Sequence, residues 1–270
     1  MRPILALMRT GGLVQGKVAI VSGIGPGMGR DISLALASEG ADIAMLARRQ
    51  DKMAEVSDEV RALGREAVAI TCDITNSDDC ARAVATTVAQ LGRIDILVNN
   101  AFDQGDYKPL LEANLDDWRQ TMETNVFGTL TLTKAAVPEM QKQGDGRVIM
   151  INTQSSLWAK ANYGAYAGSK AALAMITKNL ARELGPSGIR VNGIHPGFIW
   201  GDSVRGFIER TAAARGVEFQ TVYDEVASET CLRYLPDSAE ISGSVVFLAS
   251  DLARPVTGQW FAVNCGHYLP

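Results

Sequence analysis

The sequence contains few cysteines and histidines, with four and two respectively among its 270 residues. The cysteines stand at positions 72, 80, 231 and 265, and no two of them have C-x-x-C spacing. Isolated cysteines of this kind are typical of reduced thiols in a cytoplasmic protein. Because two histidines offer little to a zinc ion, we predict no metal site.

Long apolar runs and basic blocks are also missing. No segment approaches the roughly 20 apolar residues that a membrane helix needs, and the net charge is −4. Both features argue against a membrane or nucleic acid as the main partner. Residues 1–16 lack the long apolar segment of a secretory signal, because Arg9 and Gly11 interrupt them. We interpret 1–16 as an N-terminal extension: an atypical tail, the result of a start site placed too early, or an arm that contacts another subunit.

Strand-like and helix-like segments alternate along the rest of the chain. Apolar runs typical of buried parallel strands recur at 18–21, 43–46, 67–70, 94–98, 148–151, 189–191 and 260–263. Segments with helical periodicity follow at 53–63, 77–91, 116–141, 163–184 and 239–249. This alternation predicts an α/β fold: one Rossmann-like, doubly wound parallel sheet of about seven strands with helices on both faces. Residues 17–270 would form this single domain.

A glycine cluster follows the first strand directly. Gly23, Gly27 and Gly29 lie in SGIGPGMG, and the next residues have helical periodicity. At such a strand-to-helix turn the bare backbone can approach a pyrophosphate, and the helix N-terminus favours negative charge. The spacing is G-x-x-x-G-x-G, and the commoner G-x-G-x-x-G template fits at no register. A turn that binds no ligand is the alternative interpretation.

Tyr166 and Lys170 form the second chemical motif. They are four residues apart in a segment with helical periodicity, so they share one helix face. A free phenol has a pKa of about 10 and exchanges protons poorly at neutral pH. A neighbouring ammonium group lowers that pKa, and the phenol can then act as a general acid or base.

The chain resembles the short-chain dehydrogenase/reductase family from Lys17 to about Gly266. The resemblance rests on SGIGPGMG (22–29), CDIT (72–75), NNA (99–101), ETNVFGTL (123–130), GRVIMINT (146–153), the Tyr166–Lys170 pair, RVNGIHPG (190–197) and GQWFAVNCG (258–266). It implies a nicotinamide cofactor and contacts to it from Gly23, Gly27, Met28, Gly29, Asp73, Ile74, Asn99, Ala101, Tyr166, Lys170, Pro196, Gly197 and Ile199.

The resemblance also implies the reaction. Hydride passes between the nicotinamide and a carbonyl carbon while Tyr166 transfers the proton. Lys170 would lower the pKa of Tyr166 and reach the nicotinamide ribose. Asn125, which matches the family's helix asparagine, would hold a water that links Lys170 to solvent.

Three positions depart from the family pattern. Thr153, thirteen residues before Tyr166, stands where the family has the serine that bonds the substrate oxygen. Ser155 and Ser156 are close enough to replace it. Phe102 follows NNA in place of the usual glycine, and its ring would narrow the substrate site. Gly201 replaces a threonine that usually contacts the nicotinamide amide, so one cofactor contact would be lost.

Residues 199–236 interrupt the alternation, because they are helical in character and no strand follows them. In the resembling family this region covers the substrate, so we expect a helical lid. Its aromatic residues either line an apolar pocket or pack the lid against the body: Phe198, Trp200, Phe207, Phe219 and Tyr223.

Cofactor choice depends on the end of the second strand. NAD enzymes place an acid there to accept the ribose hydroxyls. Here Ala47 takes that position, and Arg48 and Arg49 follow. No carboxylate repels a 2′-phosphate and a guanidinium can bind one, so the sequence favours NADP(H), with NAD(H) as the alternative.

The sequence therefore predicts a carbonyl reductase or alcohol dehydrogenase acting on an apolar ketone or secondary alcohol, cyclic ones included. Two alternatives stay open: an isomerase or dehydratase that only holds the cofactor, and a non-catalytic nucleotide-binding protein. By resemblance we expect a homo-oligomer, a tetramer, built on the helices at 116–141 and 163–184. Ala165, Ala172 and Ala181 would allow those helices to approach symmetry mates closely.

Overall fold

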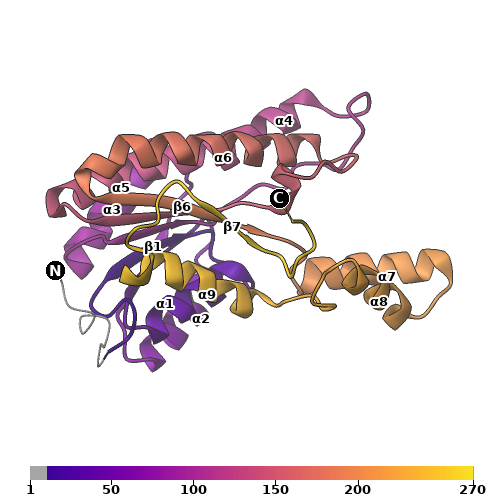
Figure 1. Cartoon of the computed structure of the whole chain (residues 1–270). Coiled ribbons are helices and arrows are strands. Elements are labelled where there is room, and N and C mark those ends of the chain that lie inside the picture. Colours follow the sequence, from indigo (N-terminus) through magenta and orange to yellow (C-terminus); the bar gives the residue numbers. More distant parts are fainter. Residues whose placement is uncertain (1–10, 270) are drawn as a thin grey trace.

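The computed structural model describes residues 11–269, which contain a seven-stranded sheet in the order β3-β2-β1-β4-β5-β6-β7 (Figure 1). All neighbouring strands are parallel. The strands are β1 (Val18–Ser22), β2 (Asp42–Ala47), β3 (Ala67–Thr71), β4 (Ile96–Asn99), β5 (Gly146–Ile151), β6 (Ile189–Pro196) and β7 (Trp260–Val263). The predicted fold class is confirmed. The strand order reverses between β1 and β4, where a doubly wound sheet opens its ligand crevice.

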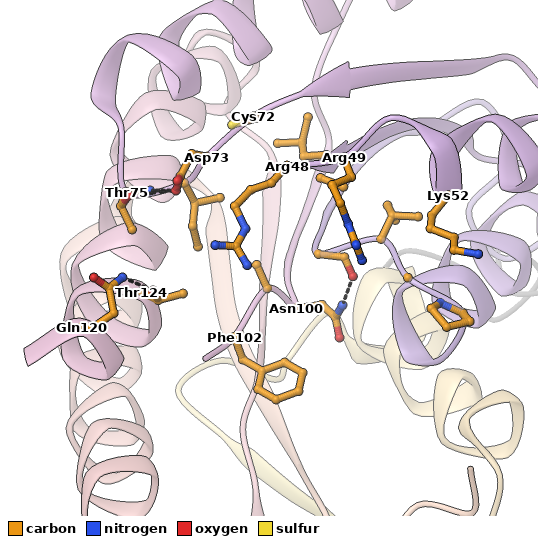
Figure 2. Close-up of a pocket in the computed structure, with 18 residues that line it drawn as sticks. Arg48, Arg49, Lys52, Cys72, Asp73, Thr75, Asn100, Phe102, Gln120 and Thr124 are labelled. Atoms are coloured by element: carbon orange, nitrogen blue, oxygen red, sulfur yellow. Dashed lines mark hydrogen bonds between the residues drawn. The ribbon is translucent and has the colours of Figure 1, made fainter. Parts of the chain in front are cut away.

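Helices cover both faces of the sheet (Figure 1). One layer consists of α1 (Met28–Ser38), α2 (Asp51–Ala62) and α9 (Ser238–Ala249). The other consists of α3 (Ser77–Leu91), α5 (Thr129–Gln143) and α6 (Gly164–Leu184). The segments that leave β2, β3 and β4 meet at the carboxyl edge of the sheet, as Arg48, Asp73 and Asn100 show in Figure 2.

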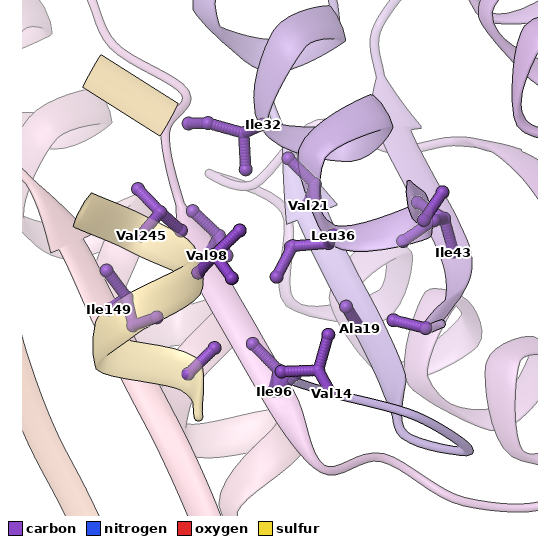
Figure 3. Close-up of a cluster of buried hydrophobic side chains, with 14 of the residues drawn as sticks. Val14, Ala19, Val21, Ile32, Leu36, Ile43, Ile96, Val98, Ile149 and Val245 are labelled. Atoms are coloured by element: carbon purple, nitrogen blue, oxygen red, sulfur yellow. The ribbon is translucent and has the colours of Figure 1, made fainter. Parts of the chain in front are cut away.

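The two layers bury separate apolar clusters. The cluster under α1 and α9 includes Ile32, Leu36 and Val245, which pack on the strand residues Val21 and Val98 (Figure 3). β1 is buried at every position, as expected for a central strand covered on both faces. This burial fixes the strand ends and holds the loops beyond them in place.

Part of the N-terminal extension belongs to the folded body. Val14 is buried in the first cluster, and its N–H donates to the backbone oxygen of Glu39. The Leu13 N–H donates to the Glu39 carboxylate at 2.7 Å. Residues 1–10 lie outside the described residues, so the predictions for that part of the extension stay open.

The predicted helix at 116–141 consists of three consecutive pieces. They are α4 (Leu115–Met122), a π-helical segment at Glu123–Gly128, and α5. A π-turn inserts one residue into the helical register, and the apolar periodicity does not reveal it. The expectation of one uninterrupted α-helix was therefore wrong, and the π-helical segment contains Asn125.

β6 is longer than the predicted 189–191, because it pairs with β5 as far as Ile194 and with β7 as far as Pro196. After it, residues 199–236 form α7 (Asp202–Arg215) and α8 (Phe219–Ser228), which extend to one side of the body (Figure 1). They enclose a small apolar cluster of their own that includes Ile208, Val222 and Leu235.

Within residues 11–269, no helix combines the length and apolar character required to cross a membrane. The same part of the chain contains no group of three or more His, Cys, Asp or Glu side chains placed to hold a metal ion.

Candidate active site

Two cavities lie side by side at the carboxyl edge of the sheet and share Pro26, Asn100 and Phe102 in their walls. The first, of about 740 Å³, lies over the glycine loop and the ends of β2 and β3 (Figure 2). The second, of about 540 Å³, is lined by the ends of β5 and β6, by α6 and by the start of the lid.

The glycines after β1 have two different roles. Gly23 has a left-handed φ of 78°, and a Cβ there would lie 2.5 Å from the Cα of Ala101. A Cβ on Gly29 would collide with the backbone oxygen of Gly23. Both glycines therefore allow close packing. At Gly25 and Gly27, in contrast, a Cβ would meet no atom within 4 Å, so their backbone faces open space where a ligand can approach.

Three cations border the first cavity at the end of β2. Arg48, Arg49 and Lys52 line it, and within the described residues none of their side chains has a hydrogen bond or ion pair (Figure 2). Across the cavity, the Asp73 carboxylate accepts from the N–H and hydroxyl of Thr75 at 3.0 and 2.8 Å. Ala47 gives the end of β2 no carboxylate, so this end of the cavity is positive.

The second cavity brings together the predicted catalytic residues. Thr153, Tyr166 and Lys170 all line it. Its other walls are mostly apolar and include Met28, Phe102, Ile151, Ile199 and Trp200. A polar cluster at the wall of an apolar cavity is the usual arrangement where a small molecule is oriented for chemistry.

Tyr166 and Lys170 are adjacent on α6, but their pKa values differ from the sequence prediction. The Lys170 Nζ lies 6.0 Å from the centre of the Tyr166 ring and donates to the backbone oxygen of Ile151 at 2.8 Å. Burial lowers the pKa of Lys170 to about 7. Burial also raises the pKa of Tyr166 above the value of a free phenol, although a hydrogen bond with Thr153 opposes the shift. The expected lowering of the Tyr166 pKa by Lys170 is not found in the chain alone, because burial raises that pKa and Lys170 does not contribute to the shift.

The local hydrogen bonds favour Thr153 over the neighbouring serines. The Thr153 hydroxyl acts to lower the pKa of Tyr166 and accepts from the Ser155 N–H at 3.2 Å. The Ser156 hydroxyl donates to the Thr153 backbone oxygen at 2.8 Å. Neither serine lines the cavity, so Thr153 is the residue of the three that is placed to contact a substrate oxygen.

Asn125 holds the wall of the site together. Its amide donates to the Asp103 backbone oxygen at 2.8 Å and to the Ser169 hydroxyl at 2.9 Å, and its oxygen accepts from the Asp103 N–H at 2.7 Å. The side chain thus joins the loop after β4 to α6. Asn125 itself lines neither cavity, and its predicted role with a water stays a prediction.

The remaining predicted cofactor residues divide between the two cavities, except Gly29 and Asn99, which line neither. The first cavity is lined by Gly23, Arg48, Asp73, Ile74 and Ala101. The second is lined by Gly27, Met28, Pro196, Gly197 and Ile199, in addition to the catalytic residues above. Most of the residues predicted from the sequence therefore meet around two adjoining cavities.

Asn99 does not fit its predicted contact. Its side chain is buried and its amide donates to the Thr133 hydroxyl at 3.0 Å, away from both cavities. The next residue, Asn100, lines both cavities, and its amide donates to the Gly23 backbone oxygen at 2.9 Å. Successive residues at a strand end point in opposite directions, so the NNA motif alone could not decide between them. The sequence analysis also missed Lys52, which the basic run around Arg48 and Arg49 could have suggested.

The lid aromatics mostly pack within the lid. Trp200 lines the second cavity, while its ring packs against those of Phe219 and Tyr223 at 6.3 and 5.2 Å. Phe198 stacks on Phe207 at 6.3 Å. The prediction of a lined pocket therefore holds for Trp200 but not for the other four.

Comparisons with known proteins agree with this site. Residues 23–267 match the family model described as Enoyl-(Acyl carrier protein) reductase. The chain is 34% identical over 253 residues to a 7alpha-hydroxysteroid dehydrogenase of Escherichia coli (strain K12), with 94% of each protein covered. It is 33% identical over 256 residues to a 3-oxoacyl-(acyl-carrier-protein) reductase of Staphylococcus epidermidis, covering 94% of this chain and 99% of that protein. Carveol dehydrogenase from Mycobacterium avium, solved in complex with NAD, matches with a TM-score of 0.87 at 29% identity, over 95% of this chain and 99% of that one.

The parallel sheet, the glycine loop and the Tyr166–Lys170 pair define a nicotinamide-dependent oxidoreductase. The chain belongs to the short-chain dehydrogenase/reductase family. It is an enzyme that uses NAD(H) or NADP(H) with a small-molecule substrate.

Proposed function

We propose that this enzyme interconverts an apolar ketone and its secondary alcohol. The observation that carries the proposal is the placement of Tyr166 and Thr153 together at the wall of a largely apolar cavity. This second cavity adjoins the first cavity, which suits a nucleotide.

The residues around the first cavity fit a nicotinamide dinucleotide. Gly25 and Gly27 present bare backbone to open space, and Gly27 is the N-cap of α1, whose first N–H groups attract phosphate. Asp73 and Asn100 offer hydrogen-bonding groups at the walls. When bound, the cofactor supplies the hydride donor or acceptor.

The chain's own residues manage the proton and the substrate oxygen. Since burial raises the pKa of Tyr166, its phenol is protonated at neutral pH and can donate to a carbonyl oxygen that gains charge. Thr153 can donate a second hydrogen bond to the same oxygen. Lys170, fixed by its bond to Ile151, supplies positive charge beside the phenol when it is protonated. A bound apolar substrate would exclude water and strengthen these interactions.

We infer a preference for NADP(H) over NAD(H). Arg48, Arg49 and Lys52 border the first cavity without partners among the described residues, and Ala47 leaves the end of β2 without a carboxylate. A 2′-phosphate would complete the hydrogen bonding of Arg48, and no acid there would repel it. The match to a structure in complex with NAD makes NAD(H) the competing choice.

The substrate class follows from the walls of the second cavity. Met28, Ile151, Ile199 and Trp200 present apolar surface, while the polar groups gather near Thr153 and Tyr166. This division suits a ketone with one oxygen on a hydrocarbon skeleton. Relatives named for hydroxysteroid and carveol oxidation support cyclic members of the class.

The test is a panel of ketones with NADPH and NADH, read by nicotinamide absorbance. The panel includes 3-methylcyclohexanone, menthone, trans-1-decalone and a steroid ketone. We expect turnover that Tyr166→Phe reduces by roughly 100- to 10,000-fold, the usual contribution of general acid–base catalysis. Cofactor binding should persist in Tyr166→Phe, because only a hydroxyl is lost. Activity of that variant within a few-fold of wild type, or no turnover of any ketone by wild type, would overturn the proposal.

A separate titration tests the cofactor preference. We expect wild type to bind NADPH more tightly than NADH, and Arg48→Ala to weaken NADPH binding roughly tenfold or more while NADH binding changes little. Binding is followed by nicotinamide fluorescence, so the result does not depend on finding a substrate. Tighter binding of NADH by wild type would show that the 2′-phosphate site is wrongly assigned.

A further inference from the structure

Phe102 is an exposed aromatic ring at the centre of the site. It is 54% exposed, and it is one of the residues that line both cavities. Figure 2 shows its ring at the edge of the first cavity, below Asn100. A ligand that covers an apolar ring left open to solvent inside a site is stabilised by that contact, because the ring is removed from water.

The backbone on both sides of Phe102 is fixed. Ala101 packs so closely on the glycine loop that a Cβ on Gly23 would lie 2.5 Å from its Cα. Asp103 is held through its N–H and its backbone oxygen by the Asn125 side chain, at 2.7 and 2.8 Å. The backbone of Phe102 is therefore held at the cavity wall, and its ring can move only by rotation of its own side chain.

The ring stands next to the proton donor. Its centre lies 6.2 Å from the centre of the Tyr166 ring, with the two planes inclined at 56°. Consider a ketone whose oxygen accepts from the Tyr166 hydroxyl. The carbon bonded to its carbonyl carbon would then be within reach of Phe102. Substituents on that carbon would meet the ring, whereas the rest of the skeleton faces Ile199 and Trp200.

We propose that Phe102 determines substrate specificity by limiting the size of the group beside the reacting carbonyl. The inference rests on the proposed function, since it places a ketone against Tyr166. Phe102 would stabilise compact ketones through contact with the ring and exclude those with a branched neighbour. A contact with the cofactor in place of the substrate is the competing interpretation, and binding measurements separate the two.

The experiment compares 3-methylcyclohexanone with menthone, which has the same ring and methyl group plus an isopropyl group beside the carbonyl. Phe102→Ala should raise the kcat/KM ratio of menthone to 3-methylcyclohexanone by roughly tenfold or more, the scale on which pocket contacts discriminate. Phe102→Tyr keeps the ring and should retain the wild-type ratio. Leu63→Ala removes a comparably exposed apolar side chain, 47% exposed, at the end of α2 and should also leave the ratio unchanged.

Cofactor binding provides the second readout. The NADPH dissociation constant of Phe102→Ala should stay within about threefold of wild type, since the cofactor phosphates face the glycine loop. If Phe102→Ala weakens NADPH binding by as large a factor as it lowers kcat/KM for 3-methylcyclohexanone, Phe102 contacts the cofactor and the proposal is overturned. An unchanged ratio in Phe102→Ala would also overturn it, as would wild type that reduces other panel ketones but neither of these two. Wild type that reduces no ketone at all would instead refute the proposed function.

Discussion

At the residue scale, the site depends on three side chains whose properties are set by burial. Thr153 and Tyr166 line the same cavity, and the Lys170 Nζ donates to the Ile151 backbone oxygen. The threonine β-methyl restricts the hydroxyl to few orientations, which serine in the same place would not do. Each of these groups can be tested separately, because each has a conservative replacement of nearly the same shape.

The first prediction concerns Thr153. Thr153→Val keeps the shape and removes the donor, so kcat should fall roughly 10- to 1,000-fold, on the scale of a lost catalytic hydrogen bond. Thr153→Ser should keep activity, and Ser155→Ala should be mild because Ser155 contributes its N–H to this contact. Steady-state kinetics on the best ketone measures all three. A harmless Val at 153 together with a severe Ala effect at 155 would transfer the role to Ser155.

The second prediction concerns the pH dependence of stability at Lys170. Its pKa is lowered to about 7 in the folded chain, against about 10.4 when unfolded. Below pH 7 both states bind the proton and the folded state bears the full cost of a buried charge. Between about pH 7 and 10.4 the unfolded state binds more protons, so stability rises with pH and the cost disappears.

Lys170→Met removes this titration. Its melting temperature relative to wild type should be highest below about pH 7 and should decline steadily up to about pH 10.4. Thermal unfolding without cofactor measures the difference between the two proteins at each pH. A difference that is constant with pH would mean that Lys170 is not desolvated as the structure indicates.

At the element scale, the C-terminal tail connects the lid to the catalytic strand end. His267 lies in this tail with its side chain only 2% exposed. Its Nδ1 lies 2.7 Å from Gln154 Nε2, and its Nε2 lies 3.0 Å from a carboxylate oxygen of Glu229 just beyond α8. Its ring also packs against Trp158 and Phe198. His267 therefore bridges the residue after Thr153 and the end of the lid.

The hydrogen bonds determine the histidine tautomer. Gln154 Oε1 accepts from the Asn264 amide at 3.2 Å, so the Gln154 Nε2 faces His267 and donates to its Nδ1. The Nε2 then carries a proton and donates to Glu229. This arrangement needs an acceptor at 229 but not a negative charge.

The third prediction follows from this bridge. His267→Ala should lower the melting temperature by about 2–4 °C per kcal/mol lost and raise the KM for ketones, while NADPH binding stays near wild type. Glu229→Gln keeps an acceptor for the Nε2 proton and should be mild. Thermal unfolding, ketone kinetics and the NADPH titration measure these effects. An unchanged KM in His267→Ala would mean that the tail does not position the lid.

At the scale of the whole molecule, the surface formed by α4, the π-helical segment and α6 presents apolar side chains to solvent. Phe127 is 53% exposed and Met175 is 58% exposed. Of the alanines predicted to face a symmetry mate, Ala165 and Ala181 are instead buried within the subunit. That part of the prediction was wrong, because Ala181 packs in the core cluster under α6 and Ala165 lies beside Gly105 of the loop after β4.

The fourth prediction is a homo-oligomer whose subunit contacts are made by the exposed residues Phe127 and Met175. We expect a homotetramer in which Phe127 and Met175 are covered by symmetry mates. Met175→Glu should lower the mass measured by light scattering at micromolar concentration, while Leu63→Glu, on another exposed surface, should not change it. A monomeric wild type would refute the expectation.

The sequence by itself determined the sheet, most helices and most of the site. Continuous apolar runs and period-3.6 patterns reflect burial, so they predict strands such as β1 and helices such as α6 without tertiary information. Parallel strands bring their carboxyl ends together, so motifs as distant as Gly23 and Tyr166 were expected in one place.

Only the tertiary structure decided the remaining properties of the site. The π-helical segment around Asn125 and the choice of Asn100 over Asn99 depend on packing, which a linear pattern does not encode. The raised pKa of Tyr166 and the lowered pKa of Lys170 also escaped the sequence. Spacing shows that two residues are neighbours, but the pKa depends on how much water each charge loses, and only the folded surroundings determine that loss.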